Sequence, residues 1–100
     1  MLNVEKKLNG SELVVEVGGR LDTSTSPELE KELKDSLGGI DKLVLDFAKL
    51  EYISSAGLRV LLATQKTING QGEMKIINVS ETIMEIFDMT GFSDILDIEE

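Results

Sequence analysis

The sequence predicts an α/β domain in which a mixed sheet of four to five strands opens with an N-terminal hairpin and carries three to four helices. Asn9–Gly10 is a strong hairpin turn signal between two strand-like runs. Further along, helix-like segments alternate with short apolar runs. A strand–helix–strand crossover over residues 42–79 requires parallel pairing there, so the sheet is expected to be mixed. One hundred residues suffice for a single domain, 1–100.

The first half of the chain is expected to hold the hairpin and one helix. Residues 2–8 alternate loosely, and residues 13–17 are rich in β-branched valine. The polar residues that follow are typical of a helix start, and Pro27 suits the first helical position. Leucines then recur every fourth residue until two glycines end the helix.

The second half alternates between strands and helices. The expected order is a buried strand at 42–47, a short loop at 50–53, a helix from the serines at 54 and 55 to residue 68, a strand at 73–79, a helix capped by Ser80 and ended by Gly91, and a short edge strand at 95–98.

The composition excludes several classes of function. The chain has no cysteine and no histidine, which excludes disulfides, thiolate zinc, imidazole metal sites and Ser-His catalysis. A net charge of −9 disfavours nucleic acids and anionic membranes as partners and favours a monomer. The N-terminus lacks the apolar run of a signal peptide, and no stretch approaches the roughly 18 apolar residues of a membrane span. We therefore expect a cytoplasmic protein of bacterial type.

Acidic residues gather at the C-terminal end of the sequence. This region is either a solvated acidic face or a surface for a basic partner. Weak binding of a divalent cation is a further alternative, although the spacing matches no compact calcium loop. Between residues 76 and 100 there is no basic residue, and the seven acids are Glu81, Glu85, Asp88, Asp94, Asp97, Glu99 and Glu100.

Residues 52–59 are the most informative segment, because they follow a predicted strand and open a predicted helix. A helix N-terminus at such a point presents unpaired backbone N–H groups and a partial positive charge. Ser54 and Ser55 lie there, and either can serve simply as a helix cap. Catalysis is not expected: Ile53 stands where a Gly-x-Ser-x-Gly motif around Ser55 needs glycine, and the chain has no histidine base.

Phosphorylation is another role open to Ser55. A phosphate adds a charge of about −1.5 to −2 and three acceptor oxygens. At a helix N-terminus this charge is stabilised by about 0.3–1 kcal/mol, so we expect the fold to tolerate it while the binding properties of the surface change. Arg59 follows one helical turn later on the same face, where it either reaches back to the phosphate or remains solvated.

Four runs carry a family resemblance through their order and spacing. They are Gly-Arg-Leu-Asp at 19–22, Leu-Val-Leu-Asp-Phe at 43–47, Ile-Ser-Ser-Ala-Gly-Leu-Arg-Val-Leu-Leu at 53–62 and Phe-Asp-Met-Thr-Gly-Phe at 87–92. Over nearly its whole length the chain resembles the STAS domain (sulphate transporter and anti-sigma factor antagonist) in its small, stand-alone form. The resemblance implies a STAS-like fold for the sheet and helices predicted above.

The resemblance also implies a phosphorylation site. Family members typically carry Asp-Ser-Ser/Thr-Gly at this turn, and the serine after the aspartate is phosphorylated; Ser55 occupies that position. Ser54 stands where the aspartate usually is and Ala56 where the second hydroxyl usually is, which leaves open the role of a neighbouring carboxylate and whether Ser54 can also be an acceptor. Asp22 matches a family aspartate near this serine or forms an Asx turn beside the helix. The residues expected at the partner interface are Asp22, Ser54, Ala56, Gly57 and Arg59.

For function, the resemblance implies a regulatory binding protein and not an enzyme. Unphosphorylated, it would bind an anti-sigma factor serine kinase with a histidine-kinase-like ATPase fold and thereby free a sigma factor or another regulator. Phosphorylation of Ser55 would abolish binding, and a phosphatase of the PP2C type would restore it. No cofactor or metal ion is expected in the protein itself. The alternative is a constitutive STAS-type subunit of a transport or regulatory complex, whose binding does not depend on Ser55.

Overall fold

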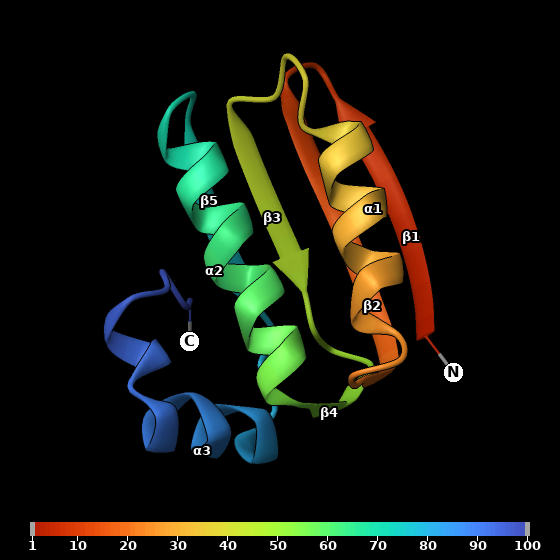
Figure 1. The fold of residues 1–100 in the computed structure, drawn as a ribbon. Coiled ribbons are helices and arrows are strands. Elements are labelled where there is room, and N and C mark those ends of the chain that lie inside the picture. The colour runs from red at the N-terminus through yellow and green to blue at the C-terminus, as the bar shows by residue number, and fades with distance from the viewer. Residues whose placement is uncertain (1, 100) are drawn as a thin grey trace.

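Five strands form one mixed sheet in the computed structural model, which describes residues 2–99 (Figure 1). Strands β1 and β2 are antiparallel, β2, β3 and β5 pair in parallel, and β4 pairs in parallel with β2 beyond the end of β3. The predicted hairpin and mixed sheet are therefore confirmed. The strands are β1 (Leu2–Asn9), β2 (Glu12–Leu21), β3 (Lys42–Asp46), β4 (Leu50–Ile53) and β5 (Glu73–Ile77).

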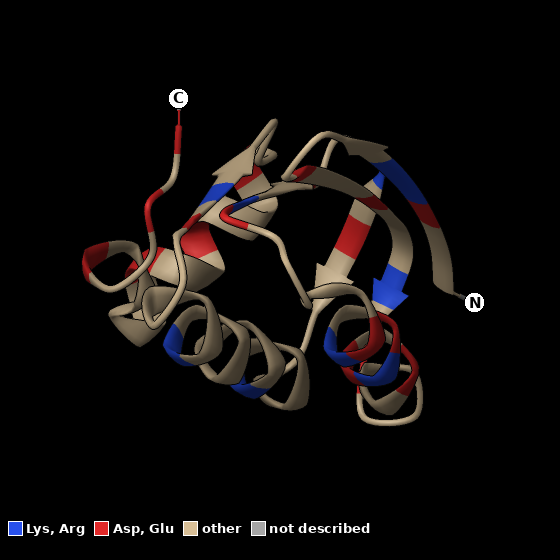
Figure 2. Cartoon of the chain, turned by 90° about the horizontal axis from the view of Figure 1, so that it is seen from above, with Lys and Arg blue, Asp and Glu red and all other residues tan. Residues whose placement is uncertain are grey.

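Helices α1 (Ser26–Ser36) and α2 (Ser55–Asn69) cover one face of this sheet, where they lie side by side and contact each other (Figure 1). Helix α3 (Glu81–Thr90) lies across the end of the sheet near β4 and is followed by the short 3₁₀ helix η1 (Phe92–Asp94) (Figure 1). Viewed from above, α1 and α2 lie on the same side of the curved sheet (Figure 2). None of the helices that residues 2–99 form is long and apolar enough to cross a membrane.

The core lies between the sheet and these helices. Alternate residues of β2 point into it, and Val15 and Val17 are at most 1% exposed. Leu29 and Leu33, four residues apart on α1, close the core from the helical side. The two periodicities that predicted strand and helix are therefore the ones that create the buried surface.

The prediction that residues 50–53 form a loop is wrong, because these residues form strand β4. Strand β2 has ten residues and β3 five, so β2 extends beyond β3 and offers unpaired backbone groups there. The overhang is filled by β4 after a register shift at Gly19/Arg20, with Leu21 opposite Ile53.

The edge strand predicted at residues 95–98 is reduced to a single bridge between Ile98 and Ile76. Gly91 ends α3 in the left-handed conformation, with φ of 80°, as predicted, and the chain then turns through η1. After η1 ends at Asp94, only the last few described residues can pair with β5, and they form the single bridge. Strand β5 itself ends at Ile77, two residues earlier than expected, because Asn78 adopts a positive φ of 57°.

Candidate functional site

Two loops leave the sheet side by side at the carboxyl ends of β2 and β4. Leu21 is the last residue of β2 and Ile53 the last residue of β4, and the two are paired in the sheet. Just beyond them, the Ser54 N–H donates to the Leu21 carbonyl oxygen at 2.9 Å. Asp22 and Ser54 are therefore brought together although 32 residues of sequence separate them. The carboxyl end of parallel strands is the usual place for binding sites in α/β folds.

Ser54 is the N-cap of α2. Its backbone is extended, its hydroxyl oxygen accepts from the Gly57 N–H at 3.4 Å, and its carbonyl oxygen accepts from the Leu58 N–H at 3.0 Å. The side chain thereby satisfies one of the backbone donors that a helix start leaves free. The capping role considered for the two serines falls to Ser54.

Ser55 is the first residue of α2 and is exposed. Its hydroxyl makes no hydrogen bond within residues 2–99. The free N–H groups of the first helical turn and the positive end of the helix dipole lie beside it. The position therefore combines an accessible hydroxyl with an environment that stabilises added negative charge.

Gly57 allows the first turn of α2 to sit directly on the strand ends. A Cβ atom at this buried position would lie 2.8 Å from Ile53 Cγ1 and 2.8 Å from Leu21 Cγ, and both of those side chains belong to the core. Any side chain larger than hydrogen would push the helix start away from the sheet. Gly57 thus acts by positioning Ser55. Ala56 is half-buried and Arg59 is exposed on the same helix.

Asp22 is held by hydrogen bonds within its own loop. Its Oδ1 accepts from the Ser24 hydroxyl at 2.8 Å, from the Ser24 N–H at 3.0 Å and from the Thr25 N–H at 3.1 Å. These hydrogen bonds lower the pKa of the Asp22 carboxyl below its ordinary value, and the bond from the Ser24 hydroxyl has the largest effect. The geometry is that of the Asx turn considered from the sequence, and it presents an ionised carboxylate beside α2.

Arg20 and Tyr52 form an exposed pair next to the site, on the other face of the sheet, that the sequence did not predict. They are cross-strand partners on β2 and β4, and Arg20 Cζ lies 4.5 Å from the centre of the Tyr52 ring. Both side chains are exposed, one residue before Leu21 and Ile53 respectively. The pair exists only because residues 50–53 form a strand, and the apolar Leu50 and Ile53 in that segment were the signal that could have revealed it.

The acidic C-terminal region does not form a metal site in the part of the chain described. No group of three or more acidic side chains within residues 2–99 is placed to hold a metal ion. The acids of α3, Glu81, Glu85 and Asp88, are exposed. Glu100, the last acid of the region, lies outside the described residues.

The fold and the site define a small α/β domain whose polar surface is built from a strand end and a helix start. The chain belongs to the STAS domain family, whose profile matches residues 3–100. The anti-sigma-B factor antagonist of Bacillus subtilis is 33% identical over 98 residues, which are 97% of this chain and 90% of that protein. That of Staphylococcus epidermidis is 35% identical over 101 residues, or 99% and 94% of the two chains.

Solved structures share the fold. An anti-sigma factor antagonist from Mycobacterium paratuberculosis superposes with a TM-score of 0.89 at 21% identity, covering 98% of this chain and 85% of that one. SpoIIAA in its unphosphorylated form superposes with a TM-score of 0.82 at 16% identity, over 100% and 89% of the chains. The phosphorylated form of Bacillus SpoIIAA gives a TM-score of 0.73, over 100% and 92%. The predicted STAS fold is confirmed.

Proposed function

We propose that this protein is an anti-sigma factor antagonist that binds an anti-sigma factor serine kinase through the surface around Ser55, and that phosphorylation of Ser55 abolishes binding. The relatives that are 33–35% identical over nearly the whole chain carry the name anti-sigma-B factor antagonist. The observation that carries the proposal is the division of labour at α2: Ser54 caps the helix, and Ser55 keeps an exposed hydroxyl that makes no hydrogen bond among residues 2–99.

The partner surface in this proposal comprises both loops. Asp22 supplies a fixed negative charge, while Ser54, Ala56 and Arg59 surround the acceptor on α2, and Gly57 sets the height of the helix start. The exposed stack of Arg20 on Tyr52 lies one residue before the two loops, but Leu21 and Ile53 point into the core, so the stack faces the opposite side of the sheet and is not part of this surface.

In the phosphorylation step the kinase uses Mg-ATP bound in its own site. The Ser55 hydroxyl oxygen bonds to the γ-phosphorus, the hydroxyl proton is released, and ADP leaves. A PP2C-type phosphatase reverses the modification by hydrolysing the phosphate ester. The antagonist needs no cofactor for either step, and a protein that controls a sigma factor acts in the cytoplasm.

The phosphate is expected to act on the interface and to leave the fold intact. At the first residue of α2 its charge faces the positive end of the helix dipole, so the domain tolerates it. In the complex, the same charge would be buried against a surface shaped for a neutral hydroxyl. An unpaired buried charge costs several kcal/mol, or about two to three decades of affinity.

The test is a pull-down from a lysate of the source cells, read by mass spectrometry, with the wild type and Ser55→Asp as baits. Ser11→Asp is the matched control, because Ser11 is also exposed and lies in the β1–β2 turn. We expect the wild type and Ser11→Asp to retain a serine kinase with a histidine-kinase-like ATPase fold and Ser55→Asp to lose it.

A constitutive adaptor is the competing function. It is favoured by one observation, namely that Ser54 and Ala56 depart from the family pattern on both sides of Ser55. If all three baits retain the same partners, and especially subunits of a transport complex, the adaptor is correct and the switch is wrong.

A further inference from the structure

The two edges of the sheet differ in how they are covered. On β5, the Ile76 N–H donates to the Asp97 carbonyl oxygen and the Glu99 N–H donates to the Ile76 carbonyl oxygen, both at 2.9 Å, so the C-terminal segment occupies that edge. At the opposite edge, β1 runs for eight residues with no strand on its outer side within residues 2–99. A long strand with a free edge is a template for pairing with another strand.

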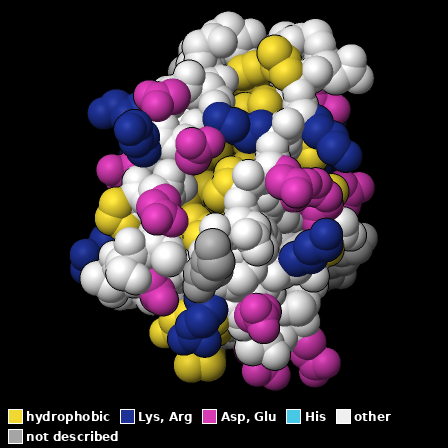
Figure 3. Space-filling view, turned by 90° about the vertical axis from the view of Figure 1, so that its right-hand side faces the viewer, with side chains coloured by type: hydrophobic (Ala, Val, Ile, Leu, Met, Phe, Trp, Pro, Cys, Tyr) yellow, Lys and Arg dark blue, Asp and Glu magenta, His cyan; other side chains and the backbone are white. Residues whose placement is uncertain are grey.

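Side chains alternate between the two faces of β1. Val4 and Lys6 pair with buried β2 residues, so these two and Leu8 point to the helical side of the sheet. Glu5 and Lys7 point to the other face. Leu8 is 66% exposed. Figure 3 looks onto this side of the molecule and shows basic and acidic side chains interspersed with exposed hydrophobic ones.

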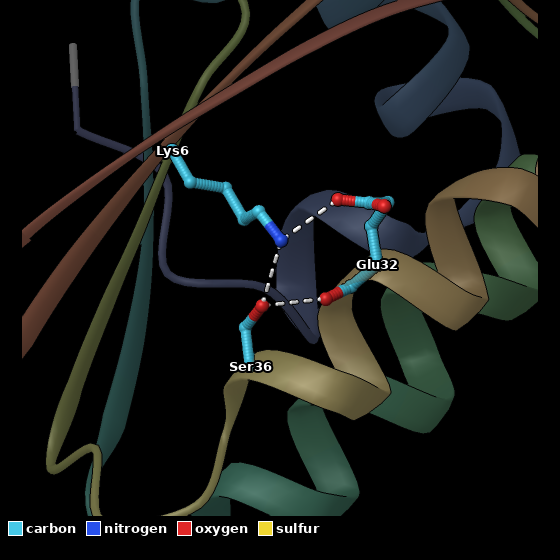
Figure 4. A network of polar contacts seen from close by, with 3 residues as sticks. All are labelled: Lys6, Glu32 and Ser36. Atoms are coloured by element: carbon cyan, nitrogen blue, oxygen red, sulfur yellow. Dashed lines mark hydrogen bonds and ion pairs between the residues drawn. The ribbon is translucent and has the colours of Figure 1, made fainter.

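The charges on β1 are unequally satisfied within the chain. The Lys6 ammonium lies 2.8 Å from Glu32 Oε2 and donates to the Ser36 hydroxyl at 3.1 Å, tying β1 to α1 (Figure 4). By contrast, Glu5 stands opposite Glu16 of β2, a like charge, and Lys7 stands opposite an uncharged valine. Neither Glu5 nor Lys7 forms an ion pair within residues 2–99.

We propose that β1 pairs antiparallel with β1 of a second copy of this chain, with the two-fold axis at Lys6, so that the two sheets become one. Glu5 then faces Lys7 of the partner subunit, and Val4 faces Leu8 of the partner subunit; the symmetry repeats each contact. The two Lys6 side chains also face each other, but each ammonium is already held against Glu32 of its own chain. The dimer thus supplies the opposite charge that Glu5 lacks within its own chain and covers Leu8.

The side-chain pattern selects this register over its neighbours. If the axis lay at Glu5, the two Glu5 carboxylates would face each other, and if it lay at Lys7, the two Lys7 ammonium groups would face each other. Like charges directly opposite each other destabilise strand pairing. An axis between two residues would pair side chains from opposite faces of the sheet, which a continuous sheet does not permit. Only the axis at Lys6 puts opposite charges and apolar side chains in register.

The dimer is independent of the switch at Ser55. Strand β2 and helix α1 separate β1 from α2 (Figure 1), so both subunits keep the start of α2 accessible. One strand from each subunit makes a small interface, and we expect a reversible, concentration-dependent dimer. This proposal replaces the monomer expected from the net charge alone.

The test is sedimentation equilibrium of the full chain over a concentration series. Lys7→Glu creates two Glu–Glu pairs per dimer, and we expect it to weaken association by about tenfold or more. The double variant Glu5→Lys/Lys7→Glu exchanges the two charges and is expected to restore association to within about threefold of the wild type. Lys66→Glu is the control for the charge change itself, because Lys66 is an exposed residue of α2.

Each variant is first checked for folding by circular dichroism and thermal unfolding. A concentration-dependent dimer that Lys7→Glu weakens, the double variant restores and Lys66→Glu leaves unchanged supports the proposal. A wild type that remains monomeric at every concentration overturns it, as does a dimer that responds equally to Lys7→Glu and Lys66→Glu. A double variant that fails to recover association overturns the register.

Discussion

The starts of α1 and α2 lie at the same end of the sheet but use their polar residues differently. Before α1, the Thr25 hydroxyl donates to the Arg20 carbonyl oxygen at 2.7 Å and does not cap the helix. The Asp22 carboxylate accepts hydrogen bonds from the backbone N–H groups of Ser24 and Thr25 in the same loop. Before α2, Ser54 alone caps the helix, and the Ser55 hydroxyl is left without a hydrogen bond among the described residues.

This difference shows how one small surface can combine rigidity with chemical access. The loop before α1 uses its side chains to fix its own shape, and the result is a stationary carboxylate. The start of α2 assigns capping to one serine and leaves the next free for modification. The hydrogen bond from the Ser54 N–H to the Leu21 carbonyl oxygen locks the two regions to one another.

Gly57→Ala should produce the largest change in folding stability. The added Cβ would collide with Leu21 and Ile53, and we expect a loss of about 1–3 kcal/mol in the free energy of unfolding. Chemical denaturation measures it. Gly38→Ala is the control, because its Cβ would have no atom within 4 Å. Equal stability of Gly57→Ala and the wild type would show that the helix start can move away from the sheet at no cost.

Ser54→Ala should have the next largest effect. It removes the side-chain cap of α2, which costs about 1 kcal/mol in typical helices. Ser54→Thr retains a hydroxyl acceptor and is expected to keep most of the stability in the same denaturation experiment. If Ser54→Ala and Ser54→Thr have the same free energy of unfolding, the side-chain cap contributes nothing to stability, and the two helix starts are less different than the structure indicates.

Asp22→Asn should alter the dependence of stability on pH. The folded-state pKa of Asp22 lies below its ordinary value of 3.8, so the contribution of the carboxylate is present above about pH 4 and is lost as the pH falls through the lowered pKa. We therefore expect the variant to be less stable than the wild type at neutral pH, and the difference to shrink in acid. Asp35→Asn, at an exposed carboxylate without a hydrogen bond among residues 2–99, is the control. A constant difference across the range would contradict the assignment.

Ser55→Ala should have the smallest effect on folding, within about 0.5 kcal/mol, because the hydroxyl makes no hydrogen bond in the described residues. The same variant should retain kinase binding in the pull-down but take up no phosphate when incubated with the captured kinase and Mg-ATP, as read by intact mass. A clear loss of stability would mean that Ser55 shares the capping role, and phosphate incorporated at Ser54 would move the acceptor by one residue.

Local signals in the sequence determined much of this protein. The β1–β2 hairpin, the cap at Ser80 and the left-handed stop at Gly91 were all predicted, because each depends on the conformational preferences of a few neighbouring residues. The hairpin turn itself is one residue later than predicted, at Gly10–Ser11, because Asn9 still pairs with Glu12. The run around Ser55 likewise marked a helix start at the end of a strand, because serines before an apolar helical pattern act locally.

Tertiary structure alone decided how these pieces meet. Strand β4 forms because β2 is longer than β3, and this length difference brings Arg20 onto Tyr52 and Asp22 beside Ser54. The C-terminal segment is likewise reduced to one bridge at Ile76. Pairing and register between distant strands depend on which backbone groups remain unsatisfied after the rest of the sheet has formed, and no short stretch of sequence contains that information.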